Sequence, residues 1–232
     1  IILHVFRMII SIHQPNYIPW IGYFSKIKSS NHFVFLDDAQ YSKNNYINRV
    51  KVLSPSGFGK WITIPVSYQY TDLIREVVAV DGWTKAHLDI LRNYYSKHNM
   101  FDIVWPDIEK MYLTASSYKL LSEINIFFIK SIMSLLSIHI DCSKSSDYKI
   151  KSMSDDRLIE IVKKNDSNGT YLSGKGGAKY QDVNKFKLNG IKVKYTQFIH
   201  PIYEQSPSSF IQGLSILDLV FSVGWNKARE LI

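Results

Sequence analysis

A short, isoleucine-rich segment near the start of the chain, residues 8–13, constrains the fold more than any other feature. A brief apolar run that ends at Gln14-Pro15 is typical of a buried strand, because proline interrupts regular backbone hydrogen bonding. The pattern then predicts a helix over residues 20–29 and a second strand over residues 32–36. Consecutive parallel strands need a crossover connection, usually a helix, so this order of elements indicates a parallel crossover unit.

The rest of the chain continues to alternate strands with helices. Further strands are expected at residues 61–66, 77–80, 138–142, 170–172 and 191–199. Helices are expected at residues 85–97, 103–113, 118–136, 155–164, 178–188, 215–221 and 226–231, the last two joined at Gly224, and a long polar loop at 39–60. We therefore predict an α/β fold, a mostly parallel sheet flanked by helices, of the doubly wound type, with a helical insertion around residues 83–136. We expect a single domain over residues 8–232, preceded by an N-terminal extension, residues 1–7.

Composition excludes several classes of protein. With 46% hydrophobic and 21% charged residues among 232, the chain can bury a full core, which excludes a disordered protein. Cys142 is the only cysteine, which excludes a disulfide framework and zinc sites built from paired cysteines. Polar side chains interrupt the most apolar stretch, residues 120–140, and we expect neither membrane insertion nor a secretory signal. We expect a cytoplasmic protein, which the lone cysteine fits, with no metal or organic cofactor.

The chain carries a net charge of +8, and the position of this charge matters more than its size. Between Lys175 and Lys194 there are six lysines against one acidic residue, Asp182. A local excess of positive charge directly after a glycine-rich turn favours a compact phosphate group over a long polymer as the partner. Nucleic acid is the competing partner, but no recognition motif accompanies the lysines, and we do not expect it to bind.

Polar residues follow three of the expected strands at the point where each strand ends. These residues are His13-Gln14, Asp37-Asp38 with Gln40, and the loop Ser173–Gly177. In open α/β sheets, ligands bind beyond the carboxyl ends of the strands. The coincidence of the three groups therefore predicts one shared site.

Each candidate has a functional and a structural interpretation. A histidine at the end of a buried strand can act as a general base, or can be a core residue bonded to a backbone carbonyl. Asp37 and Asp38 alternate sides on a strand, so at most one faces a given site, where it orients a histidine or caps a turn. Arg49 can bind a carboxylate or phosphate through two hydrogen bonds, or can remain a solvated loop residue. Lys85 and His87 point to different faces of a helix, and each can instead be a surface residue.

The loop Ser173–Gly177, with the sequence Ser-Gly-Lys-Gly-Gly, resembles a phosphate-holding turn, because glycines let backbone amides approach an anion. It matches neither the Walker sequence nor the dinucleotide-binding Gly-x-Gly-x-x-Gly pattern. Its position after a strand and before the lysine-rich stretch supports a binding role. Cys142 has no local base to activate it, and core packing is its expected role.

Several blocks of the sequence resemble the WbqC-like family of bacterial proteins. The N-terminal block has Gln14-Pro15, Pro19 and Gly22-Tyr23-Phe24, followed by Asp37, Asp38, Gln40, Asn48-Arg49 and Trp61. Later blocks are Trp83 with Lys85 and His87, Tyr171 with Ser173-Gly174, Gly176-Gly177 and Tyr180, and the end around Gln205 and Leu214–Asp218. The resemblance covers roughly residues 8–230. It implies a role in building surface polysaccharides such as the O-antigen of lipopolysaccharide, in pathways that decorate nucleotide-linked amino sugars with acyl or aminoacyl groups.

The leading hypothesis is a transferase that moves an acyl or aminoacyl group onto the amine of a nucleotide-linked amino sugar, with that sugar and an acyl donor as its partners. The catalytic candidates are His13, Asp38 and His87. The substrate-binding candidates are Gln14, Gln40, Arg49, Lys85, Ser173, Gly174, Lys175, Gly176, Gly177 and Tyr180. The residues leave open a non-catalytic module that binds a nucleotide sugar or a partner transferase, and they do not fix the oligomeric state.

Overall fold

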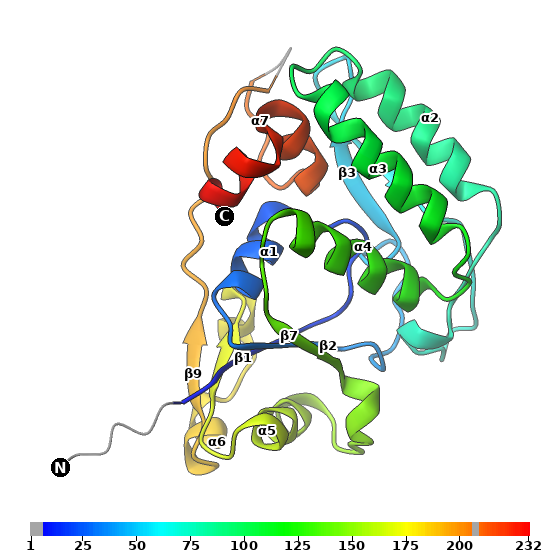
Figure 1. The fold of residues 1–232 in the computed structure, drawn as a ribbon. Helices are drawn as coiled ribbons and strands as arrows, with labels where there is room; N and C mark the ends of the chain where they lie inside the picture. Colours follow the sequence, from blue (N-terminus) through cyan, green and yellow to red (C-terminus); the bar gives the residue numbers. More distant parts are fainter. Residues whose placement is uncertain (1–6, 206–208) are drawn as a thin grey trace. The chain divides into compact units, whose positions relative to one another are not determined.

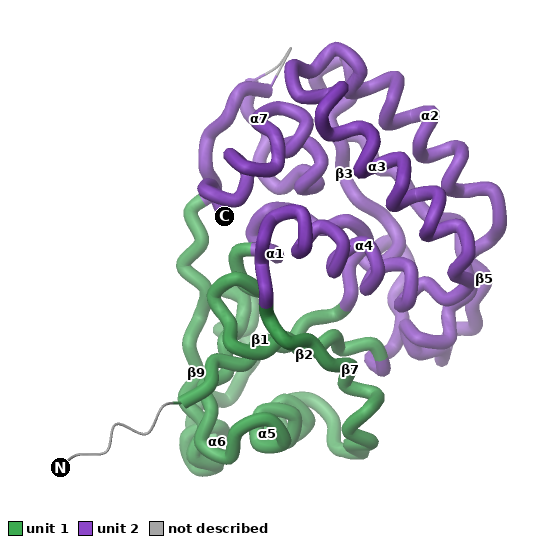
Figure 2. The backbone as a smooth tube through the Cα atoms, in the orientation of Figure 1, with its two compact units in different colours: residues 1–14, 25–37, 140–199 green, residues 15–24, 38–139, 200–232 purple. Residues whose placement is uncertain are grey.

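A computed structural model describes residues 7–205 and 209–232 (Figure 1). The chain divides into two compact units, each built from separate segments of the sequence (Figure 2). Unit 1 consists of residues 1–14, 25–37 and 140–199, and unit 2 consists of residues 15–24, 38–139 and 200–232. The single domain expected over residues 8–232 is not tested by this division and stays a prediction.

Unit 1 is built around a five-stranded sheet in which all neighbouring strands are parallel (Figure 1). Its strands lie in the order β7 (Asp141–Lys144), β2 (His32–Phe35), β1 (Ile9–His13), β8 (Thr170–Ser173) and β9 (Lys192–Tyr195). Numbered along the chain, the order is 3-2-1-4-5, which matches the first five strands of the doubly wound dinucleotide-binding sheet. The predicted α/β fold with a parallel sheet and flanking helices is confirmed. The strand order reverses between β1 and β8, and such folds bind their ligands at this reversal.

Alternation along β1 assigns its side chains to the two faces of the sheet. The flanking helices are α1 (Ile21–Lys28), α5 (Ser154–Asn165) and α6 (Val183–Leu188). Ile10 and Ile12 are buried in an apolar cluster with side chains of α5 and α6. Ser11 points to the opposite face and accepts a hydrogen bond of 2.6 Å from Ser30 Oγ, just after α1. Burial of the isoleucines fixes the register of the strand, and the Ser11 hydroxyl is satisfied.

The glycine-rich loop does not start an α-helix at Ala178 as predicted. A 3₁₀ turn, η3 (Lys175–Lys179), follows β8, and α6 begins only at Val183. The Asp182 carboxylate accepts hydrogen bonds from the backbone N–H groups of Asn184 (3.0 Å) and Lys185 (3.3 Å) and so caps this helix. The predicted helix over 178–188 is therefore wrong in its first turn, because the cap at Asp182 fixes a later start.

Unit 2 combines antiparallel strand pairs with helices. The strand pairs are β3 (Arg49–Leu53) with β4 (Gly59–Thr63), and β5 (Val66–Ser67) with β6 (Val78–Ala79). The 3₁₀ turn η1 (Ile74–Glu76) precedes β6. The loop predicted over 39–60 is wrong where β3 and the start of β4 form a hairpin, whereas residues 39–48 and 54–58 contain no helix or strand. Val50 and Val52 are buried, and Gly57, with φ of 81°, closes the turn through a hydrogen bond of 2.9 Å from its N–H to the Ser54 carbonyl.

The helices of unit 2 lie close to their predicted spans. They are α2 (Trp83–Tyr95), α3 (Phe101–Ala115), α4 (Leu121–Leu135) and α7 (Ile216–Leu231). Gly224 interrupts α7 with a non-helical φ of 75°, so two helical segments meet at this glycine as predicted. Within residues 7–205 and 209–232, no helix has both the length and the apolar character needed to span a membrane.

Candidate functional site

The carboxyl edge of the unit 1 sheet brings two of the predicted groups together. β1 and β8 are neighbours, and Ser11 lies opposite Leu172 in their register. Two residues further along, His13-Gln14 and the loop Ser173–Gly177 leave the sheet side by side. They do so where the strand order reverses, the position at which doubly wound sheets bind ligands.

His13 is partly buried at the end of β1, and its Nδ1 lies 3.0 Å from the carbonyl oxygen of Gln14. A carbonyl only accepts hydrogen bonds, so Nδ1 donates, and the lone pair of the neutral ring is on Nε2. Burial and the nearby charge of Lys26 lower the pKa of His13 to about 4, against the opposing effect of the Gln14 hydrogen bond. The imidazole is therefore neutral at pH 7, which is the state that a general base requires.

Lys26 is the functional candidate that the sequence predictions missed. It lies on α1 and is 5% exposed, and its Nζ donates a hydrogen bond of 2.9 Å to the Ile12 carbonyl. Burial lowers the pKa of Lys26 to about 7, so both protonation states are populated at neutral pH. Shifted pKa values at a ligand-binding edge are a physical sign of a functional site. The sequence carries no signal for this residue, because an isolated lysine on a helix is usually solvated.

The glycine loop presents bare backbone beside exposed lysines. Among the described residues, chain neighbours aside, no atom lies within 4 Å of the position that a Cβ would take at Gly174 or Gly176. Gly177 differs, because a Cβ there would lie 2.3 Å from Ser173 Oγ, so close packing requires a glycine. The side chains of Lys175, Lys179 and Tyr180 are exposed. Open space over Gly174 and Gly176 allows an anion to approach the main chain.

Asp37 and Asp38 have different surroundings. Asp37 is buried and accepts hydrogen bonds from the Ser146 N–H (3.0 Å), the Ser146 hydroxyl (2.7 Å) and the Ser145 hydroxyl (3.2 Å). It thereby ties the end of β2 to the 3₁₀ turn η2 (Ser145–Tyr148), which follows β7. Asp38 belongs to unit 2 and is partly buried. Asp37 thus has a structural role, and the catalytic role of Asp38 stays a prediction.

The other predicted binding residues, Gln40, Arg49 and Lys85, lie in unit 2 on three different segments. Gln40 Nε2 donates a hydrogen bond of 2.9 Å to the Tyr70 carbonyl. The Arg49 guanidinium lies 4.2 Å above the Trp61 ring and donates to the Asn44 carbonyl. Lys85 is exposed and forms an ion pair of 3.4 Å with Asp89, one helical turn along α2. Their roles in substrate binding stay predictions.

His87 lies in a chain of buried hydrogen bonds within unit 2. Its Nε2 lies 3.1 Å from the Thr63 carbonyl and must donate to it, which leaves Nδ1 to accept from the Tyr17 hydroxyl, 2.8 Å away. The Tyr17 hydroxyl in turn accepts from the Tyr112 hydroxyl. Burial lowers the pKa of His87 to about 4, so the ring stays neutral at pH 7. Both ring nitrogens of His87 therefore have hydrogen-bond partners within unit 2, and a catalytic role for His87 stays a prediction.

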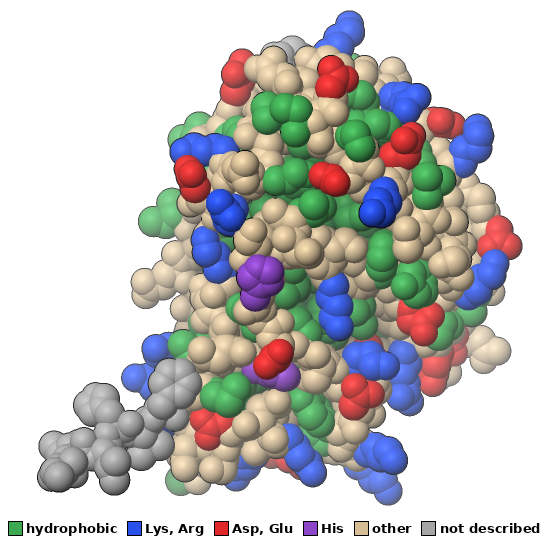
Figure 3. All heavy atoms as spheres, in the orientation of Figure 1, with side chains coloured by type: hydrophobic (Ala, Val, Ile, Leu, Met, Phe, Trp, Pro, Cys, Tyr) green, Lys and Arg blue, Asp and Glu red, His purple; other side chains and the backbone are tan. Residues whose placement is uncertain are grey.

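The positive charge of the lysine-rich stretch is partly compensated. Lys185 forms an ion pair of 2.7 Å with Asp156 of α5. On the face drawn in Figure 3, acidic side chains lie between the basic ones, and no continuous basic surface is visible there. A long polyanion binds through many phosphate contacts along a basic surface, so this face does not favour nucleic acid as a partner.

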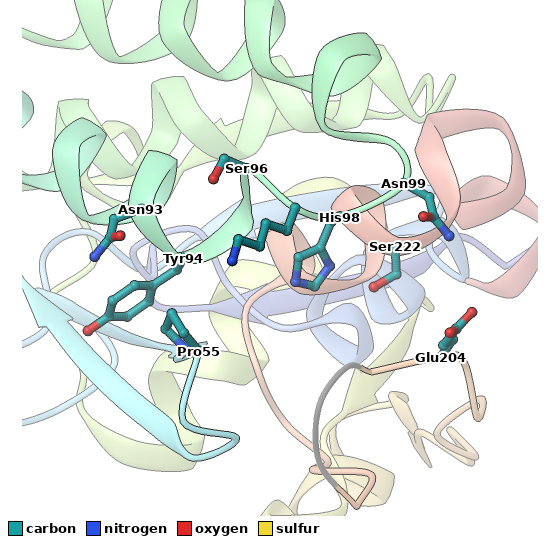
Figure 4. A pocket seen from close by; sticks show the side chains of 9 residues that line it. Pro55, Asn93, Tyr94, Ser96, His98, Asn99, Glu204 and Ser222 are labelled. Carbon is teal, nitrogen blue, oxygen red and sulfur yellow. The ribbon is translucent and has the colours of Figure 1, made fainter.

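Unit 2 contains a cavity of about 470 Å³ (Figure 4). Its lining residues are Pro55, Asn93, Tyr94, Ser96, Lys97, His98, Asn99, Glu204 and Ser222. Burial lowers the pKa of His98, so this histidine is neutral at pH 7. None of the predicted catalytic or binding residues lines this cavity, and charged groups of both signs do.

The strand order, with its reversal between β1 and β8, places unit 1 among the parallel α/β folds. The chain belongs to the WbqC-like protein family, whose family model matches residues 14–230. It is 32% identical over 220 residues to the uncharacterized protein Rv1507c of Mycobacterium tuberculosis (strain ATCC 25618 / H37Rv), an alignment that covers 93% of this chain and 94% of that protein. No solved structure gives a significant match to the chain.

Proposed function

We propose that this protein transfers an acyl or aminoacyl group to the amine of a nucleotide-linked amino sugar. In this proposal it acts in the cytoplasm, in the biosynthesis of a surface polysaccharide such as O-antigen. The observation that carries the proposal is the neutral imidazole of His13 beside the buried Lys26, at the reversal of the strand order. Membership of the WbqC-like family supports the pathway, because it agrees with the resemblance found in the sequence.

In the proposed transfer reaction, His13 acts as the general base. The sugar amine attacks the acyl carbonyl carbon, a C–N bond forms, and the bond from that carbon to the leaving group of the donor breaks. The amine loses a proton in this step, and the lone pair on His13 Nε2 accepts it before passing it to the leaving group. The pKa of about 4 keeps the imidazole neutral throughout the neutral pH range.

The glycine loop is assigned to the pyrophosphate of the nucleotide sugar. The open space over Gly174 and Gly176 supports this assignment, since backbone N–H groups bind phosphate oxygens when no side chain intervenes. Lys175 and Lys179, exposed on η3, supply positive charge to the same loop. Gln14, Ser173 and Tyr180 are assigned to the same ligand as further polar contacts.

Calorimetry with a panel of dTDP- and UDP-linked amino sugars tests the binding step. We expect heat from at least one amino sugar and a weaker signal from the same nucleotide linked to a sugar without an amine. Gly174→Ala is expected to weaken binding, because its methyl group occupies the space above the loop. No heat from any member of the panel would contradict the proposal.

Product analysis by mass spectrometry tests the transfer step, with acyl thioesters and aminoacyl adenylates as donors. His13→Ala is expected to keep the sugar nucleotide bound and to lower the rate by about 10²–10⁴, the usual contribution of a general base. His139→Ala is the matched control, since His139 is an exposed histidine. Binding without turnover, together with full pathway activity of His13→Ala, would instead identify a non-catalytic binding module.

A further inference from the structure

Unit 1 contains a cavity of about 570 Å³ that none of the predicted site residues lines. Its lining residues include Ser25 and Lys26 of α1, Lys194 and Tyr195 of β9, and Thr196 directly after β9. The Thr196 N–H donates a hydrogen bond of 2.9 Å to the Ser173 carbonyl, which fixes this wall to the end of β8. Binding sites for small molecules have volumes of roughly 300–1,000 Å³, and this cavity falls in that range.

The polar lining of the cavity favours a negative ligand. Two lysines line it, Lys26 and Lys194, and no aspartate or glutamate is among the described lining residues. Ser25, Tyr195 and Thr196 add hydroxyl groups that can donate hydrogen bonds to oxygen atoms. Donors and positive charge without a carboxylate are the surroundings that a phosphate or carboxylate group requires.

Tyr195 gives an independent indication of a missing polar contact. Its hydroxyl oxygen is buried and has no hydrogen-bond partner among the described residues. A buried hydroxyl without a partner destabilises a fold, so a phenylalanine at this position would suit the unliganded protein better. A ligand in the cavity would supply the hydrogen-bond acceptor that the Tyr195 hydroxyl lacks among the described residues.

Lys26 gives a second indication. Its ammonium group has three N–H donors, and the described residues accept one hydrogen bond from it, at the Ile12 carbonyl. Lys26 is 5% exposed, so water reaches it poorly. An anion in the cavity would provide the opposite charge that a buried ammonium group lacks.

We propose that this cavity binds a small organic anion through a phosphate or carboxylate group, with Lys26, Lys194 and the Tyr195 hydroxyl as its polar contacts. A cavity of this volume accommodates a ligand of mononucleotide size. This site is distinct in its residues from the glycine loop. It does not depend on the proposed transferase reaction, because it concerns binding alone.

Isothermal titration calorimetry of the full chain with inorganic phosphate, uridine monophosphate and acetate tests the proposal. We expect saturable binding of at least one of the three, and the stronger of phosphate and acetate identifies the group that the cavity prefers. Tyr195→Phe is expected to keep or raise the melting temperature and to weaken binding about tenfold, the effect of one hydrogen bond to a charged group. Lys26→Met is expected to abolish binding.

Lys194→Gln and Lys192→Gln form a matched pair. Both lysines are exposed on β9 and, two residues apart, lie on the same face of the strand, but only Lys194 lines the cavity. Lys194→Gln is expected to weaken binding several-fold, and Lys192→Gln to leave it unchanged at constant ionic strength. Equal effects of the two variants would indicate a diffuse attraction to positive charge and would overturn the proposal.

Two further results would overturn it. One is the absence of binding of all three anions to the wild-type protein. The other is wild-type affinity in a stable Tyr195→Phe variant together with loss of affinity in Gly174→Ala, which would assign the anion to the glycine loop. Neither result requires an amino sugar or an acyl donor, so failure of this proposal is distinguishable from failure of the proposed transferase function.

Discussion

The Lys26 Nζ lies 2.9 Å from the carbonyl oxygen of Ile12, the residue directly before His13 on β1. This contact keeps a cation close to the candidate base, and the charge of Lys26 is one of the causes that lower the pKa of His13 to about 4. His13 does not shift the pKa of Lys26 in return, because the imidazole is already neutral at the pH near 7 where Lys26 titrates. Lys26 thus helps to keep the imidazole in the neutral state.

Replacing Lys26 is therefore expected to change the titration of His13. Lys26→Met removes the positive charge while keeping a long apolar side chain, so the pKa of His13 should rise from about 4. It should remain below 6.5, since burial is the larger cause of the shift. NMR titration of the histidine ring protons measures this directly. Lys28→Met, an exposed lysine on the same helix, is the control, and an unchanged His13 pKa in Lys26→Met would contradict the prediction.

The stability of the fold should fall as the pH is lowered from 7 to 4. The pKa values of His13 and His87 are lowered from 6.5 to about 4 in the folded state, so between these values the unfolded chain binds more protons. Asp218 opposes this trend, because burial raises its pKa from 3.8 to about 6 and its stabilising effect is lost as the pH rises. The two histidines outweigh the one aspartate, so the free energy of unfolding should fall by a net amount on the order of 3 kcal/mol between pH 7 and pH 4.

Urea unfolding at several pH values between 4 and 7 checks this prediction. His139→Ala should leave the slope unchanged, because His139 is exposed. A free energy of unfolding that is constant, or that rises as the pH falls, would show that the two histidines are not buried in the neutral state.

Tyr17→Phe should destabilise unit 2. The Tyr17 hydroxyl donates to His87 Nδ1 and accepts from Tyr112, so its removal leaves two buried polar atoms without their partner. The expected cost is about 1–3 kcal/mol for each buried atom left unsatisfied. Chemical denaturation measures the change. Tyr46→Phe is the control, since Tyr46 is 42% exposed, and equal stability of the two variants would argue against the hydrogen-bond chain.

The glycine loop allows a prediction that separates packing from binding. Gly177→Ala should destabilise the fold by about 1–3 kcal/mol, because the added methyl group would press against Ser173 Oγ, 2.3 Å from the new Cβ. Gly174→Ala should unfold at the same temperature as the wild-type protein, since no described residue other than its chain neighbours has an atom within 4 Å of its Cβ position. Differential scanning calorimetry compares the two, and a reversed order would mean that the loop packs differently.

The first part of the sheet could be predicted from the sequence because its signals are local. Three isoleucines close to Gln14-Pro15 predict a buried strand, and β1 lies over Ile9–His13 as expected. The strand predicted over 61–66 overlaps β4, but β3 was missed, because Arg49 and Lys51 give it a polar pattern that is uncommon in strands. Its formation depends on the burial of Val50 and Val52 by distant parts of the chain, a contribution that a local pattern does not contain.

The candidate site could be predicted only in part for a related reason. His13 and the loop Ser173–Gly177 each follow a strand, so their common edge follows from the rules for parallel sheets. Lys26 carries no such signal, since an isolated lysine on a helix is usually solvated. Its burial and its contact with Ile12 depend on how α1 packs on the sheet, which becomes visible only in three dimensions.

The pairing of β1 has a consequence for the way in which the chain is made. Ile9 pairs with Thr170 on one side of β1, whereas Ile10 pairs with His32 on the other. During synthesis on the ribosome, β2 can join β1 early, but the other edge of this central strand stays open until the chain has been translated beyond residue 170. A nascent chain with an exposed, isoleucine-rich strand edge is prone to aggregation until β8 pairs with it.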